Sequence, residues 1–157
     1  MVPDCAEQRD LAGAGTQSIA RSQSWNTPRL LAEAGVRYMC DWVNGDLPYS
    51  VHTPAGPILN VPINHELSDR QIITVQQHSA DSYAGQIQDA YELMAREAEH
   101  YGGRLLPLHV TPYIMGLRYR IDAFERVLAW LAVQPAAGFA TTGEVAKAAD
   151  QPGFKKT

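Results

Sequence analysis

His109 is the side chain whose type and place in the sequence point most directly to chemistry. It ends an apolar run, and this pattern predicts a buried strand over residues 104–109. Imidazole changes its charge near neutral pH, so it serves readily as a general acid or base. Because α/β folds place their sites at the carboxyl ends of strands, the pattern predicts that His109 faces such a site. The alternative is a histidine that only makes a hydrogen bond at a strand end.

Two arginines follow His109 at short range. Pro112 and Gly116 predict a rigid loop, and Arg118 and Arg120 then lead into a new helix. A titratable ring and two guanidinium groups within a dozen residues favour a ligand site. The alternative is that both arginines are simply solvated.

Other polar side chains also follow predicted strands. Asp41 closes one apolar stretch, and His65 and Glu66 directly follow another. The carboxyl ends of parallel strands lie at one edge of a sheet, so these side chains and His109 are expected to meet there. A carboxylate beside an imidazole stabilises the charged ring, which suits a general acid. We therefore predict that Asp41 and His109 share a polar cluster in the largest pocket, with Trp42 as one wall. Alternatively, Asp41 only caps a turn and His109 only bonds a backbone carbonyl.

The elements that must position these residues alternate along the chain. After a short helix at 29–34 that Gly35 stops, this alternation predicts parallel strands with helices outside, open or closed into a barrel. Residues 48–49 and 53–57 are expected in an ordered loop, and Asp69 is expected to open a short helix at 71–78. Residues 1–18 are predicted to be a loose arm, 19–150 the domain and 151–157 a frayed tail. The predicted strands are 36–42, 58–63, 104–109 and 138–141, and the predicted helices are 81–101, 120–132 and 143–149. Asp81 and Ser82 are expected to cap the helix at 81–101, and Thr142 is expected to cap the helix at 143–149.

Composition limits the class of protein. The chain has 157 residues, 45% of them hydrophobic and 19% charged, which is typical of one globular domain. The net charge of -4 argues against nucleic acid or an anionic membrane as a partner. The sequence has neither a membrane-span pattern nor a signal peptide at its start, so we expect a cytoplasmic protein. Cys5 and Cys40 form no metal-type or redox-type pair, and Cys40 is expected to be a buried free thiol.

Several motifs in order resemble the polysaccharide deacetylase family (the chitooligosaccharide deacetylase homology domain), and most of all its allantoinase-like and peptidoglycan-deacetylase-like branch. The similarity extends from about Gln17 to Ala149 and is specific in the order of its motifs rather than in any one of them. The motifs are Ser22-Gln23-Ser24 with 26–35, Tyr38 to Asn44, Leu47-Pro48-Tyr49, Glu66-Leu67-Ser68-Asp69, Leu108-His109 with Pro112, Gly116 and Arg120, and Phe139-Ala140-Thr141 with Glu144-Val145.

This resemblance implies the C-terminal half of a distorted (β/α) barrel and hydrolysis of a non-peptide amide, such as the N-acetyl group of an amino sugar. It implies that His109 is the general acid for the leaving amine. It also implies that Asp41 and Trp42 support the catalytic groups and form a pocket wall. Tyr49, Glu66, Arg118 and Arg120 would contact the substrate, a small carbohydrate or cyclic amide.

The chain departs from the family pattern at the metal site. Members bind a divalent metal such as zinc through an Asp and a His-x-x-x-His pair, and a second Asp is the base. Those motifs lie in the N-terminal half of the family domain, before the part that this chain resembles, and no two of its five histidines are four residues apart. Gly45 and Gly138 stand where the branch has an acid and a Trp. No cofactor is therefore expected in this chain, which looks like a truncated, C-terminal portion, although some allantoinase-like members are thought to work without metal.

Three functional hypotheses stay open at this point. The chain is a carbon–nitrogen hydrolase that needs its missing half from another chain, or a non-catalytic remnant or carbohydrate-binding subunit. The third hypothesis is a stable α/β domain without a site. A half barrel leaves strand edges unpaired, so we expect self-association or a partner that supplies the missing half domain.

Overall fold

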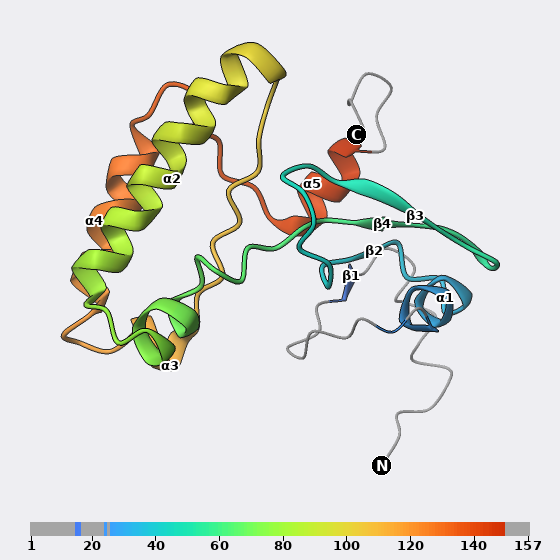
Figure 1. Cartoon of the computed structure of the whole chain (residues 1–157), viewed down its shortest axis with the longest axis horizontal. Helices are drawn as coiled ribbons and strands as arrows, with labels where there is room; N and C mark the ends of the chain where they lie inside the picture. Colours follow the sequence, from blue (N-terminus) through green and yellow to red (C-terminus); the bar gives the residue numbers. More distant parts are fainter. Residues whose placement is uncertain (1–14, 17–23, 25, 150–157) are drawn as a thin grey trace. The chain divides into compact units, whose positions relative to one another are not determined.

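The computed structural model describes residues 15–16, 24 and 26–149, and the chain divides into two compact units. The first unit comprises Met1–Ile63 with Ala140–Thr157, and the second comprises Asn64–Phe139. The predicted arm and tail lie almost wholly outside the described residues. The elements are β1 (Gly15–Thr16), α1 (Asn26–Glu33), β2 (Tyr38–Met39), β3 (Tyr49–Thr53), β4 (Gly56–Asn60), the π-helix η2 (Arg70–Val75), α2 (Ala80–Tyr101), α3 (Pro112–Met115), α4 (Ile121–Ala132) and α5 (Thr142–Ala149) (Figure 1).

The first unit contains a small mixed sheet of order β1-β2-β4-β3. β2 runs parallel to β1 and to β4, whereas β3 runs antiparallel to β4. The α/β class is thus confirmed, but the prediction of parallel strands alone was wrong. Of the loop predicted over 48–49 and 53–57, residues 49, 53, 56 and 57 belong to strands, whereas 54–55 form a turn. A tight turn makes the β3–β4 hairpin possible: the Thr53 hydroxyl donates to the Gly56 carbonyl at 2.6 Å, and Gly56 has a φ of 115°.

α1 ends where the sequence predicted. Gly35 takes a φ of 76°, a conformation that costs glycine little. The amide of Val36 then donates to the carbonyl of Leu31, which closes the helix with a Schellman motif. α1 packs against β3 and β4. The buried core of this unit is Val36, Met39, Val51 and Ile58, with Leu31, Ala32, Trp42 and Tyr49 packed against it.

A capping box starts α5. The amide of Glu144 donates to the Thr141 hydroxyl oxygen at 3.3 Å, and the Glu144 carboxylate accepts from the Thr141 amide at 2.7 Å. Hydrogen bonds from the Thr141 amide and hydroxyl lower the pKa of Glu144. The cap is therefore Thr141, not Thr142 as predicted. The strand predicted over 138–141 is also absent from the described structure, because Thr141 is used to begin this helix.

In the second unit, α2 and α4 lie side by side (Figure 1). The ring of Tyr91 meets that of Trp130 edge-on, with centroids 5.5 Å apart. The helices predicted over 81–101 and 120–132 are both confirmed, with small shifts at their ends. Ser79, not Asp81 or Ser82, caps α2, and its hydroxyl oxygen accepts from the amide of Ser82 at 3.1 Å.

The core of the second unit joins the helices to the segments before and after α2. It consists of Leu67, Ile72, Ile73, Tyr83, Ile87, Ile114, Met115, Val127 and Leu131. The short helix predicted over 71–78 is instead the π-helix η2. No helix in the described ranges is long and apolar enough to cross a membrane.

The segment that carries His109 is not a strand. No residue from Gly102 to Val110 belongs to a strand of the described structure, so the strand predicted over 104–109 was wrong. Pro107 has no N–H to donate to a ladder, and Leu106, Leu108 and Val110 are only half-buried against the helical core. The apolar run thus serves packing rather than sheet formation, and it leads directly into α3.

Candidate functional site

Asn60 fixes the backbone of Trp42 in the first unit. Its side chain is fully buried, accepts from the Trp42 amide at 3.3 Å and donates to the Trp42 carbonyl at 3.0 Å. Asn60 is the last residue of β4, which pairs with β2 just before Asp41 and Trp42. Asp41 is 7% exposed and thus buried. Sequence reasoning missed Asn60, although an Asn inside an apolar strand pattern is itself a signal.

Tyr49 lies in β3 rather than in a loop. Its hydroxyl donates to the side-chain oxygen of Asn44 at 2.6 Å. Burial raises the pKa of Tyr49, and the hydrogen bond to Asn44 partly opposes this shift. Nearby, burial and then the charge of Asp41 raise the pKa of the Cys40 thiol to about 11. Cys40 is a buried free thiol as predicted, and it is protonated at neutral pH.

Asp69 is a fully buried carboxylate in the second unit and, as predicted, stands at the start of a short helix. It precedes η2, but its side chain makes no capping bond to that helix. One carboxylate oxygen accepts from the Thr111 amide at 2.6 Å, and the other accepts from the Thr111 hydroxyl at 3.0 Å. The backbone amide of Asp69 also donates to the carbonyl of His109 at 3.3 Å. Asp69 therefore holds the chain on both sides of residue 110.

The imidazole of His109 lies near a second imidazole. The ring centroids of His65 and His109 are 6.0 Å apart, with the planes tilted by 59°. His109 Nδ1 is buried and has no hydrogen-bond partner in the described part of the chain. Glu66 follows His65 and is exposed. The hydroxyl of Tyr83 is also buried without a described partner, and burial and then the charge of Asp69 raise the pKa of Tyr83.

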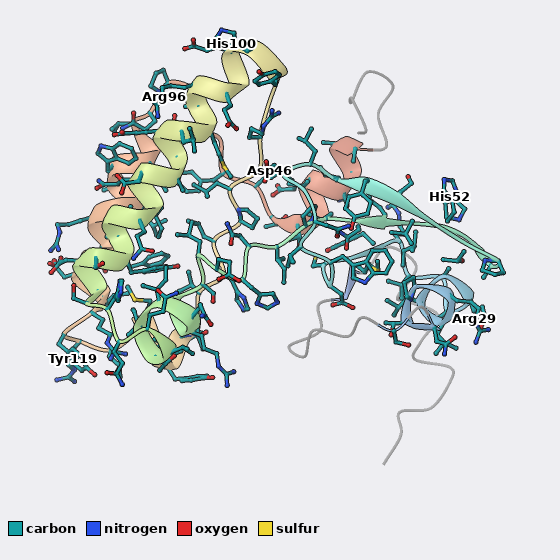
Figure 2. All side chains as sticks on the ribbon, viewed as in Figure 1. Arg29, Asp46, His52, Arg96, His100 and Tyr119 are labelled. Carbon is teal, nitrogen blue, oxygen red and sulfur yellow. The ribbon has the colours of Figure 1, made fainter. Side chains whose placement is uncertain are left out.

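The two arginines of the predicted site differ in their surroundings. Arg118 is exposed, whereas Arg120 is half-buried and donates to the carbonyl of Ile114 at 3.2 Å. The guanidinium carbon of Arg120 also lies 5.1 Å from the centroid of the Tyr119 ring. Figure 2 shows Tyr119 at the end of this unit where α4 begins, and His100 at the opposite end of α2. Arg120 thus has a structural role between α3 and α4, and ligand binding by either arginine stays a prediction.

The predicted site residues fall into two groups. Asp41, Trp42 and Tyr49 belong to the first unit, and Glu66, His109, Arg118 and Arg120 belong to the second. The pairing of Asp41 with His109 stays a prediction. It also loses one of its premises, because His109 does not end a strand of the same sheet.

A metal centre does not fit the described residues. In residues 15–16, 24 and 26–149, no three His, Cys, Asp or Glu side chains are grouped so that they could hold a metal ion. Two imidazoles near each other are too few ligands for a typical catalytic zinc, which needs three.

No protein-family model and no curated protein matches this chain. Several solved structures, however, match this chain in fold. A probable polysaccharide deacetylase from Pseudomonas aeruginosa PAO1 is 24% identical, with a TM-score of 0.73 over 80% of this chain and 43% of its own. Puue allantoinase is 24% identical, with a TM-score of 0.74 over 81% of this chain and 43% of its own. The chain therefore has part of the polysaccharide deacetylase fold and spans less than half the length of these proteins.

Proposed function

We propose that this chain is part of a polysaccharide deacetylase-type hydrolase that cleaves non-peptide carbon–nitrogen bonds, such as the N-acetyl amide of an amino sugar or a cyclic amide. The observation that carries the proposal is the likeness of fold to a probable deacetylase and to an allantoinase over at least 80% of the chain. We further propose that this part corresponds to the C-terminal half of a distorted barrel.

In this proposal His109 is the general acid. When water has added to the amide carbon, the carbon–nitrogen bond breaks and the leaving nitrogen takes a proton from the imidazolium. Asp41 is the second proposed catalytic residue, and the indole of Trp42 forms a wall of the substrate pocket. Tyr49, Glu66, Arg118 and Arg120 contact sugar hydroxyl or acidic groups. The base that activates water belongs to the part of the hydrolase that the chain does not span. No step of this proposal uses a metal ion held by the described residues.

A complementation experiment tests this role of His109. The chain is mixed with the N-terminal part of the Pseudomonas aeruginosa protein, and acetate release from N-acetylglucosamine oligomers is measured. His109→Gln should lower the rate by about 100-fold or more, since general acid catalysis is worth about 10² to 10⁴. The matched control is His100→Gln, because His100 is exposed at the end of α2 and should be dispensable.

Equal rates for the His109 and His100 variants would refute the assignment of the acid. Binding of the oligomers without acetate release, measured by calorimetry, would instead support the second candidate, a non-catalytic carbohydrate-binding subunit.

We also propose that the chain works in the cytoplasm with a second polypeptide, either another copy or one that supplies the missing half of the domain. The sheet edges at β1 and β3, which have no further strand beside them in the described residues, support this proposal. The net charge of -4 disfavours nucleic acid or an anionic membrane as the partner. Light scattering that gives a monomer mass over a wide concentration range would contradict self-association.

A further inference from the structure

We propose that Asp69 and Thr111 form a clamp that positions the imidazole of His109, so that Asp69 is a positioning residue for the reaction proposed above. The inference rests on that proposed function only for its catalytic consequence. The clamp itself rests on contacts within the second unit.

The fold buries Asp69 completely. A carboxylate with no exposed surface loses its hydration, and that loss must be offset by strong hydrogen bonds. Both oxygens of Asp69 have such a bond, and both donors belong to Thr111, at 2.6 Å and 3.0 Å. Charge-assisted bonds of this kind are about twice as strong as neutral ones and fix geometry as well as energy. One residue, Thr111, thus donates both charge-assisted bonds to the Asp69 carboxylate.

The hydrogen bonds of Asp69 begin at the carbonyl group of His109. The Asp69 amide holds the carbonyl of residue 109, and the Asp69 carboxylate holds the amide of residue 111. The segment forms no strand ladder in the described structure, so a sheet does not fix its backbone. Asp69 is 42 residues away in sequence from Thr111 and therefore ties this segment to the loop before η2. The Cα of His109 is bonded directly to the carbonyl carbon at the start of the stretch that these three bonds hold.

Hydrogen bonding at Nδ1 does not orient the imidazole of His109 in the described structure. Nδ1 of His109 is buried without a partner in the described part of the chain, so no described hydrogen bond at that atom orients the ring. The placement of the ring then depends on its backbone and on packing beside His65. Loss of the clamp should therefore move or loosen the imidazole, whereas a purely stabilising pair would leave the ring unchanged in the molecules that stay folded.

Thr111→Val in the full chain is the main test, with Thr111→Ser as the conservative variant that keeps the hydroxyl. The matched control is Thr53→Val, because Thr53 is equally half-buried and its hydroxyl also donates one bond, to the Gly56 carbonyl. The first readout is the nitrogen-15 spectrum of the His109 ring at fixed pH, assigned with His109→Gln. We expect Thr111→Val to shift or broaden the His109 ring signals, and Thr111→Ser and Thr53→Val to leave them as in the parent chain.

The second readout is the split between kcat and KM in the complemented enzyme. Misplacement of a catalytic group by about 1 Å costs on the order of 100-fold in rate. Thr111→Val should thus lower kcat by about tenfold to 100-fold with little change in KM, and Thr111→Ser should restore it. Unchanged His109 ring signals in the Thr111→Val variant would overturn the clamp. Acetate release that is missing already in the parent enzyme would instead overturn the proposed function and leave the clamp to be judged by the ring signals.

Discussion

Replacing Asn60 by alanine should destabilise the first unit, and the structure gives the size of the effect. The change removes two neutral hydrogen bonds, one to the amide and one to the carbonyl of Trp42. Each such bond contributes about 1 kcal/mol, so the loss should be about 2 kcal/mol. The buried side chain also leaves a small cavity, and Trp42 keeps backbone groups without these partners. We therefore expect a total decrease of about 2–4 kcal/mol in the free energy of unfolding.

Urea unfolding at pH 7 and 25 °C, followed by far-UV circular dichroism, measures this decrease. The matched control is Asn44→Ala, which removes the same atoms and one hydrogen bond from the hydroxyl of Tyr49, but at an exposed position. Water can replace that bond, so the control should lose less than about 1 kcal/mol. If the two variants differ by less than about 0.5 kcal/mol with unchanged m-values, the argument from burial of Asn60 is refuted.

Two further predictions concern the packing of α3 and the state of the free thiol. A Cβ at Gly116 would lie 2.4 Å from the carbonyl oxygen of Pro112, so Gly116→Ala should cost about 1–3 kcal/mol in thermal unfolding, whereas Gly103→Ala meets no atom within 4 Å and should cost less than about 1 kcal/mol. Burial raises the pKa of Cys40 from 9.0 to about 11, so the protonated thiol contributes stability below about pH 9 that is lost as the pH rises towards 11. In a Cys5→Ser background, the thiol reagent DTNB at pH 8 should react only as fast as the chain unfolds, and rapid stoichiometric labelling of the native protein would contradict this.

The helices were the most predictable part of the fold because their signals are local. α2 shows an apolar stripe at helical spacing that includes Tyr83 and Ile87, and both are fully buried. Gly102 stops the helix with a φ of 88°, as its position after the stripe indicates. Such signals need only neighbours within one or two turns, so they can be recognised without knowing the rest of the fold.

The errors arose where the partner of a segment lies elsewhere in the chain. An apolar run such as 104–109 does not reveal whether a ladder partner exists, and here its side chains pack on helices instead. β3 was missed because His52 and Thr53 do not look apolar, yet the strand is fixed by pairing with β4. Asp69 looked like a helix cap, and only the fold shows Thr111 against its carboxylate.

The candidate site was predicted only in part for the same reason. The sequence singled out Trp42 and His109 as candidate site residues, because the chemistry of an indole or an imidazole can be recognised without knowing what the side chain contacts. Asn60 and Asp69 were missed as site residues because their importance lies in the backbone groups they hold. Groups that act through distant main-chain atoms leave no periodic pattern, so sequence inspection finds the reactive side chain before its support.

β4 is paired on both of its sides, by β2 and by β3, and this limits how another polypeptide can extend the sheet of the first unit. The two edges of the described sheet are β3 and β1, and either edge can pair with a parallel or an antiparallel strand. In the described part of the chain, β1 offers the backbone groups of two residues, Gly15 and Thr16, which is a very short template. Recognition at that edge would therefore depend on the packing of side chains more than on a long hydrogen-bonded ladder.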